Sequence, residues 1–208
     1  MISLLAVSNY RSLKETRLPL GRLNLVTGAN GSGKSNLYKA LRLLSDTALG
    51  TATSSIAAEG GLDSVLWAGP ETISRAMKKG QLPVQGGPRQ KPVELKLGFV
   101  GDDFSYAIDF GMPEPVPGTM FFKDPVIKRE AIWYGGQYHP SRLMVDRRGP
   151  VIKARNQSGA WQVIDHHLHS FDSMLMRLAD PHLAPEALFL RESIRSWRFY
   201  DHFRTDRF

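Results

Sequence analysis

The sequence predicts an α/β fold, and three observations point to it. A glycine-rich loop at residues 28–35 stands between a predicted strand and a predicted helix. Residues 93–165 alternate apolar and polar side chains in short runs separated by turns, which predicts an antiparallel β subdomain. Residues 166–208 carry two helical patterns. We therefore expect one lobe over residues 1–165 and a helical segment over residues 166–208.

Three short strands are predicted before the glycine-rich loop, over residues 2–7, 16–20 and 23–27, with a polar turn at residues 9–12. After the loop the hydrophobic period changes to that of a helix. Five apolar residues then share one helical face: Leu37, Ala40, Leu41, Leu44 and Ala48. Gly50 is the expected end of this helix, because glycine tolerates the left-handed backbone that commonly follows a helix.

The middle of the chain is less regular, and we expect residues 51–92 to form a mobile insertion. Within it we expect a short helix or strand at 62–67, a helix at 71–79 and a loop at 80–92. Six later runs have the two-residue period of strands: 93–99, 104–110, 127–134, 142–145, 151–154 and 161–164. The arginines at 147–148 fall in a predicted turn. The last two predicted helices cover residues 171–179 and 185–200.

Composition excludes several classes of protein. The 208 residues are 42% hydrophobic and 23% charged, which is ordinary for a globular protein and unlike collagen, a coiled coil or a disordered chain. The chain has no cysteine, so disulfides, thiolate metal sites and cysteine nucleophiles are excluded. No apolar run approaches the ~18 residues of a membrane span, and the N-terminus does not resemble a signal peptide. We expect a cytoplasmic protein without a membrane partner.

The net charge is +7, from 27 Lys and Arg against 20 Asp and Glu. A basic balance is typical of proteins that bind phosphate or nucleic acid. The charges are not gathered in blocks, however, so a solvated basic surface explains them without any such partner. DNA binding stays open on this observation.

The glycine-rich loop carries the strongest chemical signal. Its sequence, Gly-Ala-Asn-Gly-Ser-Gly-Lys-Ser over residues 28–35, matches G-x-x-x-x-G-K-[ST] at every fixed position, in the strand-loop-helix setting that this motif requires. Glycines let the backbone curve around a phosphate, and the helix start adds a positive dipole end. The expected nucleotide contacts are Gly28, Asn30, Gly31, Ser32, Gly33, Lys34, Ser35 and Asn36. Lys34 would reach the β- and γ-phosphates, and the Ser35 hydroxyl would bind Mg²⁺. The expected cofactors are therefore ATP and Mg²⁺.

Residues 1–48 resemble the N-terminal lobe of RecF/SMC-like ATPases, which belong to the ABC-type class. The resemblance rests on an aromatic-Arg-Ser turn at residues 10–12, a second strand and the run N-x-x-x-G-x-N-G-S-G-K-S-N over residues 24–36. It implies an α/β P-loop NTPase fold, an ABC-ATPase-like lobe I with an antiparallel β subdomain and a helical C-terminal segment. It also implies that Arg11, and with less support Ser12, lies beside the nucleotide. A charge on a surface turn is an equally good interpretation of Arg11 on sequence alone.

The sequence also departs from this family. A strand ending in Asp-Glu, a signature Ser-Gly loop and a switch histidine are not found. Asp102, Asp103 and Asp146 are better explained as residues of hairpin turns. The histidines at 166, 167 and 169 lack the spacing of a metal site. We therefore expect the chain to be the N-terminal part of an ATPase, in which residues 166–208 lead to a second lobe and hydrolysis takes place at a dimer interface.

Two alternatives stay open. One is a self-contained P-loop kinase for a small molecule, in which Asp146 and the arginines at 147–148 would serve catalysis. The other is a basic DNA-binding module in which the loop has lost its function. DNA maintenance or defence is the process that the family resemblance implies.

Overall fold

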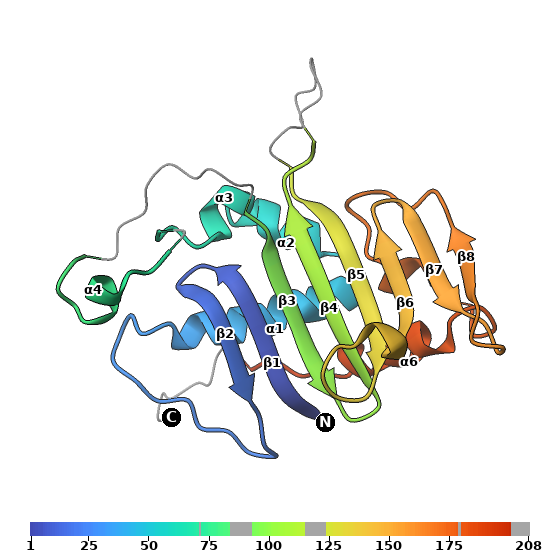
Figure 1. Ribbon diagram of the computed structural model, residues 1–208, viewed down its shortest axis with the longest axis horizontal. Helices are drawn as coiled ribbons and strands as arrows, with labels where there is room; N and C mark the ends of the chain where they lie inside the picture. The colour runs from blue at the N-terminus through green and yellow to red at the C-terminus, as the bar shows by residue number, and fades with distance from the viewer. Residues whose placement is uncertain (71, 84–92, 115–123, 179, 201–208) are drawn as a thin grey trace, which may run out of the picture.

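A computed structural model describes residues 1–70, 72–83, 93–114, 124–178 and 180–200. Its eight strands form one sheet, antiparallel throughout, in the order β2-β1-β3-β4-β5-β6-β7-β8. The strands are β1 (Ile2–Tyr10), β2 (Leu13–Pro19), β3 (Leu95–Gly101), β4 (Phe104–Gly111), β5 (Val126–Tyr134), β6 (Leu143–Arg148), β7 (Val151–Arg155) and β8 (Trp161–Asp165). From β3 onward each strand pairs with the next along the chain, as Figure 1 shows, so a meander of hairpins makes most of the sheet.

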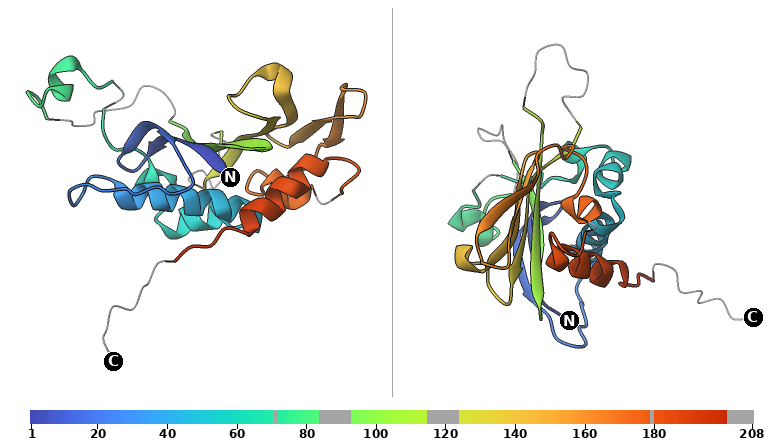
Figure 2. Two further views of the ribbon diagram at one scale, coloured as in Figure 1. Left: turned by 90° about the horizontal axis from the view of Figure 1, so that it is seen from below. Right: turned by 90° about the vertical axis from the view of Figure 1, so that its right-hand side faces the viewer.

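The helices are α1 (Lys34–Leu49), α2 (Ala52–Ala58), α3 (Leu62–Val65), α4 (Arg75–Lys78), α5 (Met174–Arg177) and α6 (Pro185–Arg195), with a short 3-10 helix at Pro140–Arg142. Helices α1, α2, α5 and α6 cover one face of the sheet (Figure 2). None of the helices in the described ranges is long and apolar enough to cross a membrane.

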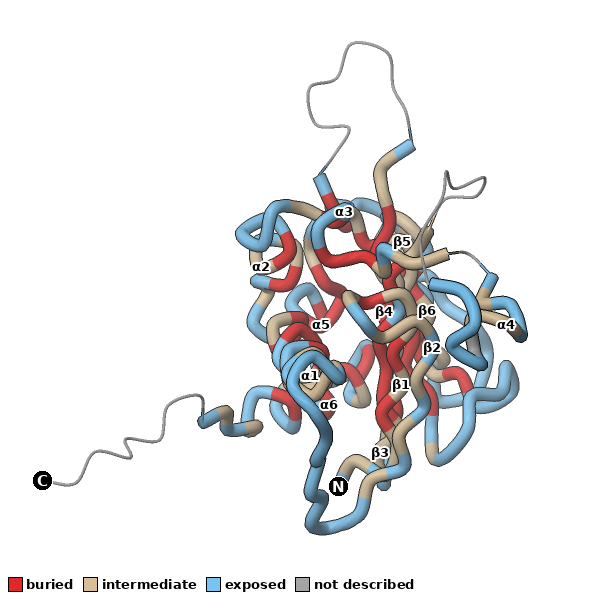
Figure 3. Tube along the Cα trace, turned by 90° about the vertical axis from the view of Figure 1, so that its left-hand side faces the viewer, coloured by how far each residue is buried: buried red, intermediate tan, exposed pale blue. Residues whose placement is uncertain are grey.

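The main core lies between the sheet and α1. Because side chains alternate along a strand, β1, β3 and β4 each direct one set of apolar residues toward the helices. Figure 3 shows the sheet edge-on beside α1, with buried (red) stretches along the strands. The sheet contributes Leu5, Val7, Leu97, Phe99, Ile108 and Phe110, and α1 contributes Ala40, Leu44 and Ala48. Burial of this face fixes the start of α1, and with it the glycine-rich loop.

The opposite face of the sheet is largely open. A small second cluster of Ala131, Trp133 and Leu143 is buried there, beneath the connection between β5 and β6. Trp133 Nε1 donates to the Gly136 carbonyl at 2.7 Å, and the Tyr138 ring packs edge-on against Trp133. This connection therefore folds back over the sheet and covers part of its open face.

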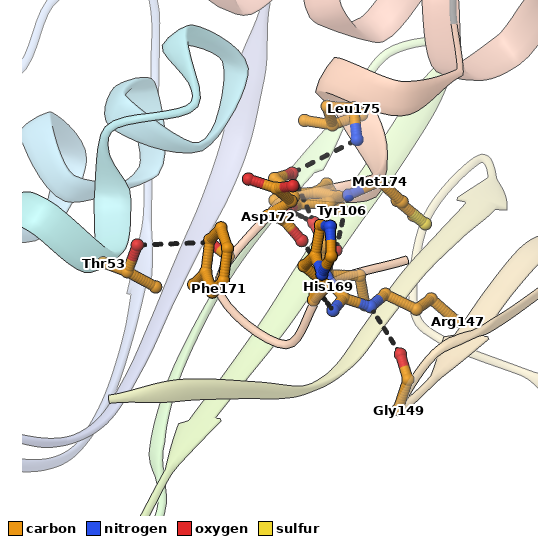
Figure 4. A network of polar contacts seen from close by, with 11 residues as sticks. Thr53, Tyr106, Arg147, Gly149, His169, Phe171, Asp172, Met174 and Leu175 are labelled. Carbon is orange, nitrogen blue, oxygen red and sulfur yellow. Dashed lines mark hydrogen bonds and ion pairs between the residues drawn. The ribbon is translucent and has the colours of Figure 1, made fainter. Parts of the chain in front are cut away.

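A buried ion pair joins β5 and β6 to the segment before α5. The Glu130 and Arg147 side chains are both 0% exposed, and Arg147 Nη1 donates to Glu130 Oε2 at 2.6 Å. Figure 4 shows this network around Arg147, Tyr106 and the chain from His169 to Leu175. The prediction that Arg147 belongs to a turn was wrong: Glu130 draws it into the core, and the turn begins only after β6.

Most predicted strands are confirmed, whereas four expectations need correction. Residues 23–27 form no strand, because no segment among the described residues pairs with their backbone. The antiparallel β subdomain predicted from residues 93–165 is not separate from the N-terminal strands in the described part, where all eight strands join one sheet. The last predicted helix ends at Arg195 instead of residue 200, and the helix predicted at 171–179 is reduced to α5.

Parts of other predictions fall outside the described residues. These are the start of the helix predicted at 71–79, most of the loop predicted at 80–92 and the last residue of the helix predicted at 171–179. Between residues 51 and 83 the structure places α2, α3 and α4. The mobility that we expected for residues 51–92 stays a prediction.

Candidate functional site

The glycine-rich loop leads directly into the longest helix of the described chain. Gly33 is the residue before α1 and has a φ of 96°, a left-handed conformation that favours glycine. A Cβ atom at Gly33 would lie 2.6 Å from Ser12 Oγ, so the position has no room for a side chain either. Backbone conformation and packing therefore both require glycine at residue 33.

Lys34 folds over the loop that precedes it. Its Nζ donates to the Gly28 carbonyl at 2.6 Å and to the Ala29 carbonyl at 2.7 Å, across the curve of the loop. The first turn of α1 holds no acidic residue, and no side chain caps its free amide groups. A phosphate at this point would meet a lysine, a helix start and open backbone donors, which is the arrangement that anions favour.

The remaining loop residues of the predicted site are accessible. Asn30, Gly31, Ser32 and Ser35 are exposed. The Ser35 hydroxyl lies in the first turn of α1, next to Lys34, and can act as one oxygen ligand of a Mg²⁺ ion that also binds phosphate oxygens. A single protein oxygen is enough for Mg²⁺ at such a site, because this ion usually takes most of its other ligands from water and from the phosphates of the nucleotide. In the described part of the chain no cluster of three His, Asp or Glu residues can hold a metal by itself.

The turn between β1 and β2 lies against the loop. Asn36 Nδ2, in the first turn of α1, donates to Ser12 Oγ at 2.8 Å. Ser12 thus contacts α1 through Asn36 and limits the space at Gly33. The structure therefore brings Ser12 together with Gly33 and with Asn36, which is 24 residues from Ser12 in sequence.

Arg11 lies in the same turn, but its side chain turns toward α2. Its guanidinium donates to the Glu59 carboxylate and stands 5.7 Å from the Tyr10 ring centre. Burial acts to lower the pKa of Arg11, and hydrogen bonds to Tyr10 and Glu59 outweigh it and raise that pKa. Arg11 is thus beside the loop and already paired. Glu59 was not predicted as a site residue. The Gly60-Gly61 pair that follows it was the feature of the sequence that could have drawn attention to this position.

The segment before the loop is extended and unpaired. Leu23 is 92% exposed and Leu25 is 88% exposed, two residues apart and so on one side of an extended chain. In the described structure the backbone of residues 22–28 makes no backbone hydrogen bond. Apolar side chains at this spacing are typical of a strand whose face is covered within a sheet. The segment therefore has a strand-like sequence, but no strand of the described structure pairs with it.

The acidic candidates lie elsewhere. Asp102 binds the N-terminal ammonium group at 2.6 Å in the hairpin between β3 and β4. Asp146 pairs with Arg129 and Arg148, each at 2.9 Å, on β6. Neither carboxylate is free to serve the loop. Arg147 is buried against Glu130, so the residues that the kinase alternative needs are held in structural contacts.

The histidine cluster has the features of a solvated loop. His166, His167 and His169 are exposed, while Leu168 between them is buried. The ring of His169 stacks on Phe171 with centroids 5.2 Å apart. Among the residues that the structure describes, these histidines do not form a group of three His, Asp or Glu side chains that could hold a metal ion.

Residues 1–85 match the family model of the AAA ATPase domain. The matched stretch contains the glycine-rich loop, the Arg11–Ser12 turn, all of α1 and Glu59. None of the curated proteins matches the chain. The match supports a P-loop ATPase of the AAA type, and with it ATP binding, as the class to which this loop belongs.

Proposed function

We propose that this chain is the Mg-ATP-binding N-terminal part of a RecF/SMC-like, ABC-type ATPase. The observation that carries the proposal is the loop itself, in which Gly33, Lys34 and the start of α1 form an anion site against Ser12. In this proposal the backbone of residues 28–35 wraps the β-phosphate, and Lys34 leaves its two carbonyl partners for the β- and γ-phosphates.

The other site residues have defined roles in the proposal. The Ser35 hydroxyl binds Mg²⁺. Asn30 faces the γ-phosphate, and Ser12 with Asn36 holds the loop against the β1–β2 turn. Arg11 contributes a positive charge beside the phosphates. When bound, Mg²⁺ would neutralise phosphate charge and orient the γ-phosphate.

Hydrolysis needs groups that we do not find at this loop. The carboxylates of Asp102 and Asp146 are held in other contacts, and the residues 23–27 lack strand partners. We propose that further polypeptide supplies an acidic strand end beside residues 23–27, and that two nucleotide sites meet at a dimer interface. DNA maintenance or defence is the process that this class implies.

Binding of ATP with Mg²⁺, measured by titration calorimetry, tests the proposal. We expect wild type to bind and Lys34→Ala to lose binding, because the lysine supplies the main charge at the loop. Lys153→Ala is the matched control, since it removes an exposed lysine from β7 without touching the loop. Equal affinity in wild type and Lys34→Ala would contradict the proposal, as would steady-state hydrolysis by the 208-residue chain at rates typical of complete ATPases.

One observation favours a second function, nucleic-acid binding. The part of the open sheet face formed by β5 to β8 carries Arg129, Arg148, Lys153, Arg155 and the exposed Trp161. Arg155 stands 4.8 Å from the Trp161 ring centre. Cations beside aromatic rings suit a polyanion with stacking bases. A Lys153→Glu/Arg148→Glu variant that loses affinity for single-stranded DNA, while Lys34→Ala keeps it, would establish this function as separate from the loop.

A further inference from the structure

The turn that carries Arg11 is strained and firmly held. Asn9 and Arg11 have φ angles of 59° and 50°, and they alone among the described non-glycine residues have positive φ. The left-handed conformation costs about 1 kcal/mol or more for such residues. Two hydrogen bonds keep the turn in place: Arg11 N donates to the Val65 carbonyl at 2.7 Å, and Trp67 N donates to the Asn9 carbonyl at 3.0 Å. Backbone strain that the surroundings enforce is concentrated at functional positions.

Glu59 satisfies Arg11 only in part. The pair is partly exposed, with 26% of the Arg11 side chain and 34% of the Glu59 side chain accessible. Arg11 Nε is buried and has no hydrogen-bond partner among the described residues. Glu59 is also 3.8 Å from Lys39 Nζ on α1, so it retains a cation if Arg11 leaves. The contact is therefore one that a stronger anion can displace.

Arg11 binds Glu59 through its side chain and precedes Ser12, the residue of the same turn that contacts α1 beside the phosphate loop. The next residue, Ser12, contacts Asn36 and limits the space at Gly33. The side chain of Arg11 is long and flexible, whereas its backbone is fixed. A nucleoside triphosphate at the loop would bring several negative charges near this turn, where they would compete with Glu59 for the guanidinium.

The residues after Glu59 allow it to respond. Gly60 and Gly61 have φ angles of 92° and 86°, and a Cβ atom at Gly61 would meet nothing within 4 Å. Two glycines in succession give the backbone at the junction of α2 and α3 conformational freedom, although a Cβ atom at Gly60 would lie 2.8 Å from Ser64 Oγ. Loss of the Arg11 contact would leave Glu59 with Lys39 and would remove one of the contacts that hold this junction.

We propose that Glu59 is the resting counter-ion of Arg11, and that bound nucleotide takes Arg11 away from it. Glu59 then competes with the phosphates for one guanidinium, and the junction of α2 and α3 reports whether the loop is occupied. This inference rests on the proposed function, since it requires nucleotide at the loop. It adds Glu59 as a positioning residue that holds Arg11 in the empty state.

The test compares Glu59→Gln with wild type in titrations with a non-hydrolysable ATP analogue and Mg²⁺. Glu59→Gln keeps the size of the side chain and removes its charge. We expect the dissociation constant to fall about two- to fivefold, the range that a partly exposed ion pair supports. In an Arg11→Ala background the same substitution should change nothing. Asp63→Asn is the matched control, because it removes a nearby exposed carboxylate that no hydrogen bond or ion pair joins to Arg11.

Hydrogen exchange gives a readout that affinity alone does not. In wild type, the analogue should speed exchange of the amides at residues 59–64, and in Glu59→Gln that change should disappear. Weaker or unchanged nucleotide binding by Glu59→Gln, with wild type binding and Lys34→Ala not binding, overturns this inference and leaves the proposed function standing. Failure of wild type itself to bind the analogue overturns both.

Discussion

Arg147 and Glu130 form a salt bridge of 2.6 Å in which neither side chain is exposed to solvent. Every oxygen of the Glu130 carboxylate has a further partner: Tyr106 and Ser173 donate to Oε1, and the Met174 amide donates to Oε2. Arg147 in turn donates to the carbonyls of Gly149, His169 and Asp172. The pair thus attaches the segment before α5 to the middle of the sheet.

Replacing one member of this pair should be strongly destabilising. Glu130→Gln leaves a buried guanidinium without its counter-charge, and we expect the free energy of unfolding to fall by about 3–5 kcal/mol. Urea unfolding followed by circular dichroism measures the change. Glu15→Gln is the control, because Glu15 is exposed on β2 and its pair with Arg17 should contribute less than about 1 kcal/mol. A loss below 1 kcal/mol for Glu130→Gln would contradict the structural role of the pair.

Asp109 should make stability depend on pH. Burial raises the pKa of Asp109, and Lys96 opposes that shift only in part. Because the folded-state pKa lies above the unfolded value, ionisation of Asp109 costs stability as pH rises through the two values. Asp109→Asn should therefore raise Tm at neutral pH and have no effect at a pH below both values. Lys96 keeps Glu94 as a partner at 2.7 Å in this variant. A Tm difference that grows toward acid pH would refute the assignment.

Gly33→Ala should impair both folding and nucleotide binding. The Cβ of the new alanine would clash with Ser12 Oγ, and the alanine backbone would have to adopt a φ of 96°. We expect a loss of about 1–2 kcal/mol from the backbone alone, and more from the clash. Gly31→Ala has a similar φ of 80° and no atom within 4 Å, so it measures the backbone part by itself. Adding Ser12→Ala to Gly33→Ala should recover part of the difference; no recovery would exclude the clash.

Leu25 should tolerate a charge that buried leucines do not. Leu25→Lys should change the free energy of unfolding by less than about 0.5 kcal/mol, as expected for an exposed position. Leu44→Ala, at a fully buried position of α1, should lower it by about 2–5 kcal/mol. Leu25→Lys should also reduce concentration-dependent self-association in analytical ultracentrifugation, because it places a charge on an unpaired apolar segment. Strong destabilisation by Leu25→Lys would show that the segment is covered.

The sequence predicted the parts of the fold that local chemistry determines. The strands from β3 to β8 follow from two-residue alternation and turn residues, and α1 follows from its apolar face between Gly33 and Gly50. Residues 23–27 show the limit of that reasoning. Their composition is that of a strand, but a strand forms only where a neighbour pairs with it, and local patterns carry no information about neighbours.

The same limit applies to the candidate site. The loop residues were predictable because the motif requires fixed residues at fixed spacing. The Arg11–Glu59 pair and the burial of Arg147 were not predictable, because each depends on a residue far away in the sequence. Glu59 is 48 positions from Arg11, and Glu130 is 17 positions from Arg147. Charged residues in a turn and in a core look alike in sequence.

The hold of Lys34 on the carbonyls of Gly28 and Ala29 has a consequence for the speed of ligand entry. An incoming phosphate must replace two hydrogen bonds, which lowers the equilibrium affinity by the strength of those bonds. The replacement itself is a rotamer change of a solvent-accessible side chain, and such changes take picoseconds to nanoseconds. Diffusional encounters at ordinary ligand concentrations are far slower. The two hydrogen bonds to the loop carbonyls should therefore lower the affinity through faster release, while the association rate stays set by diffusion and charge.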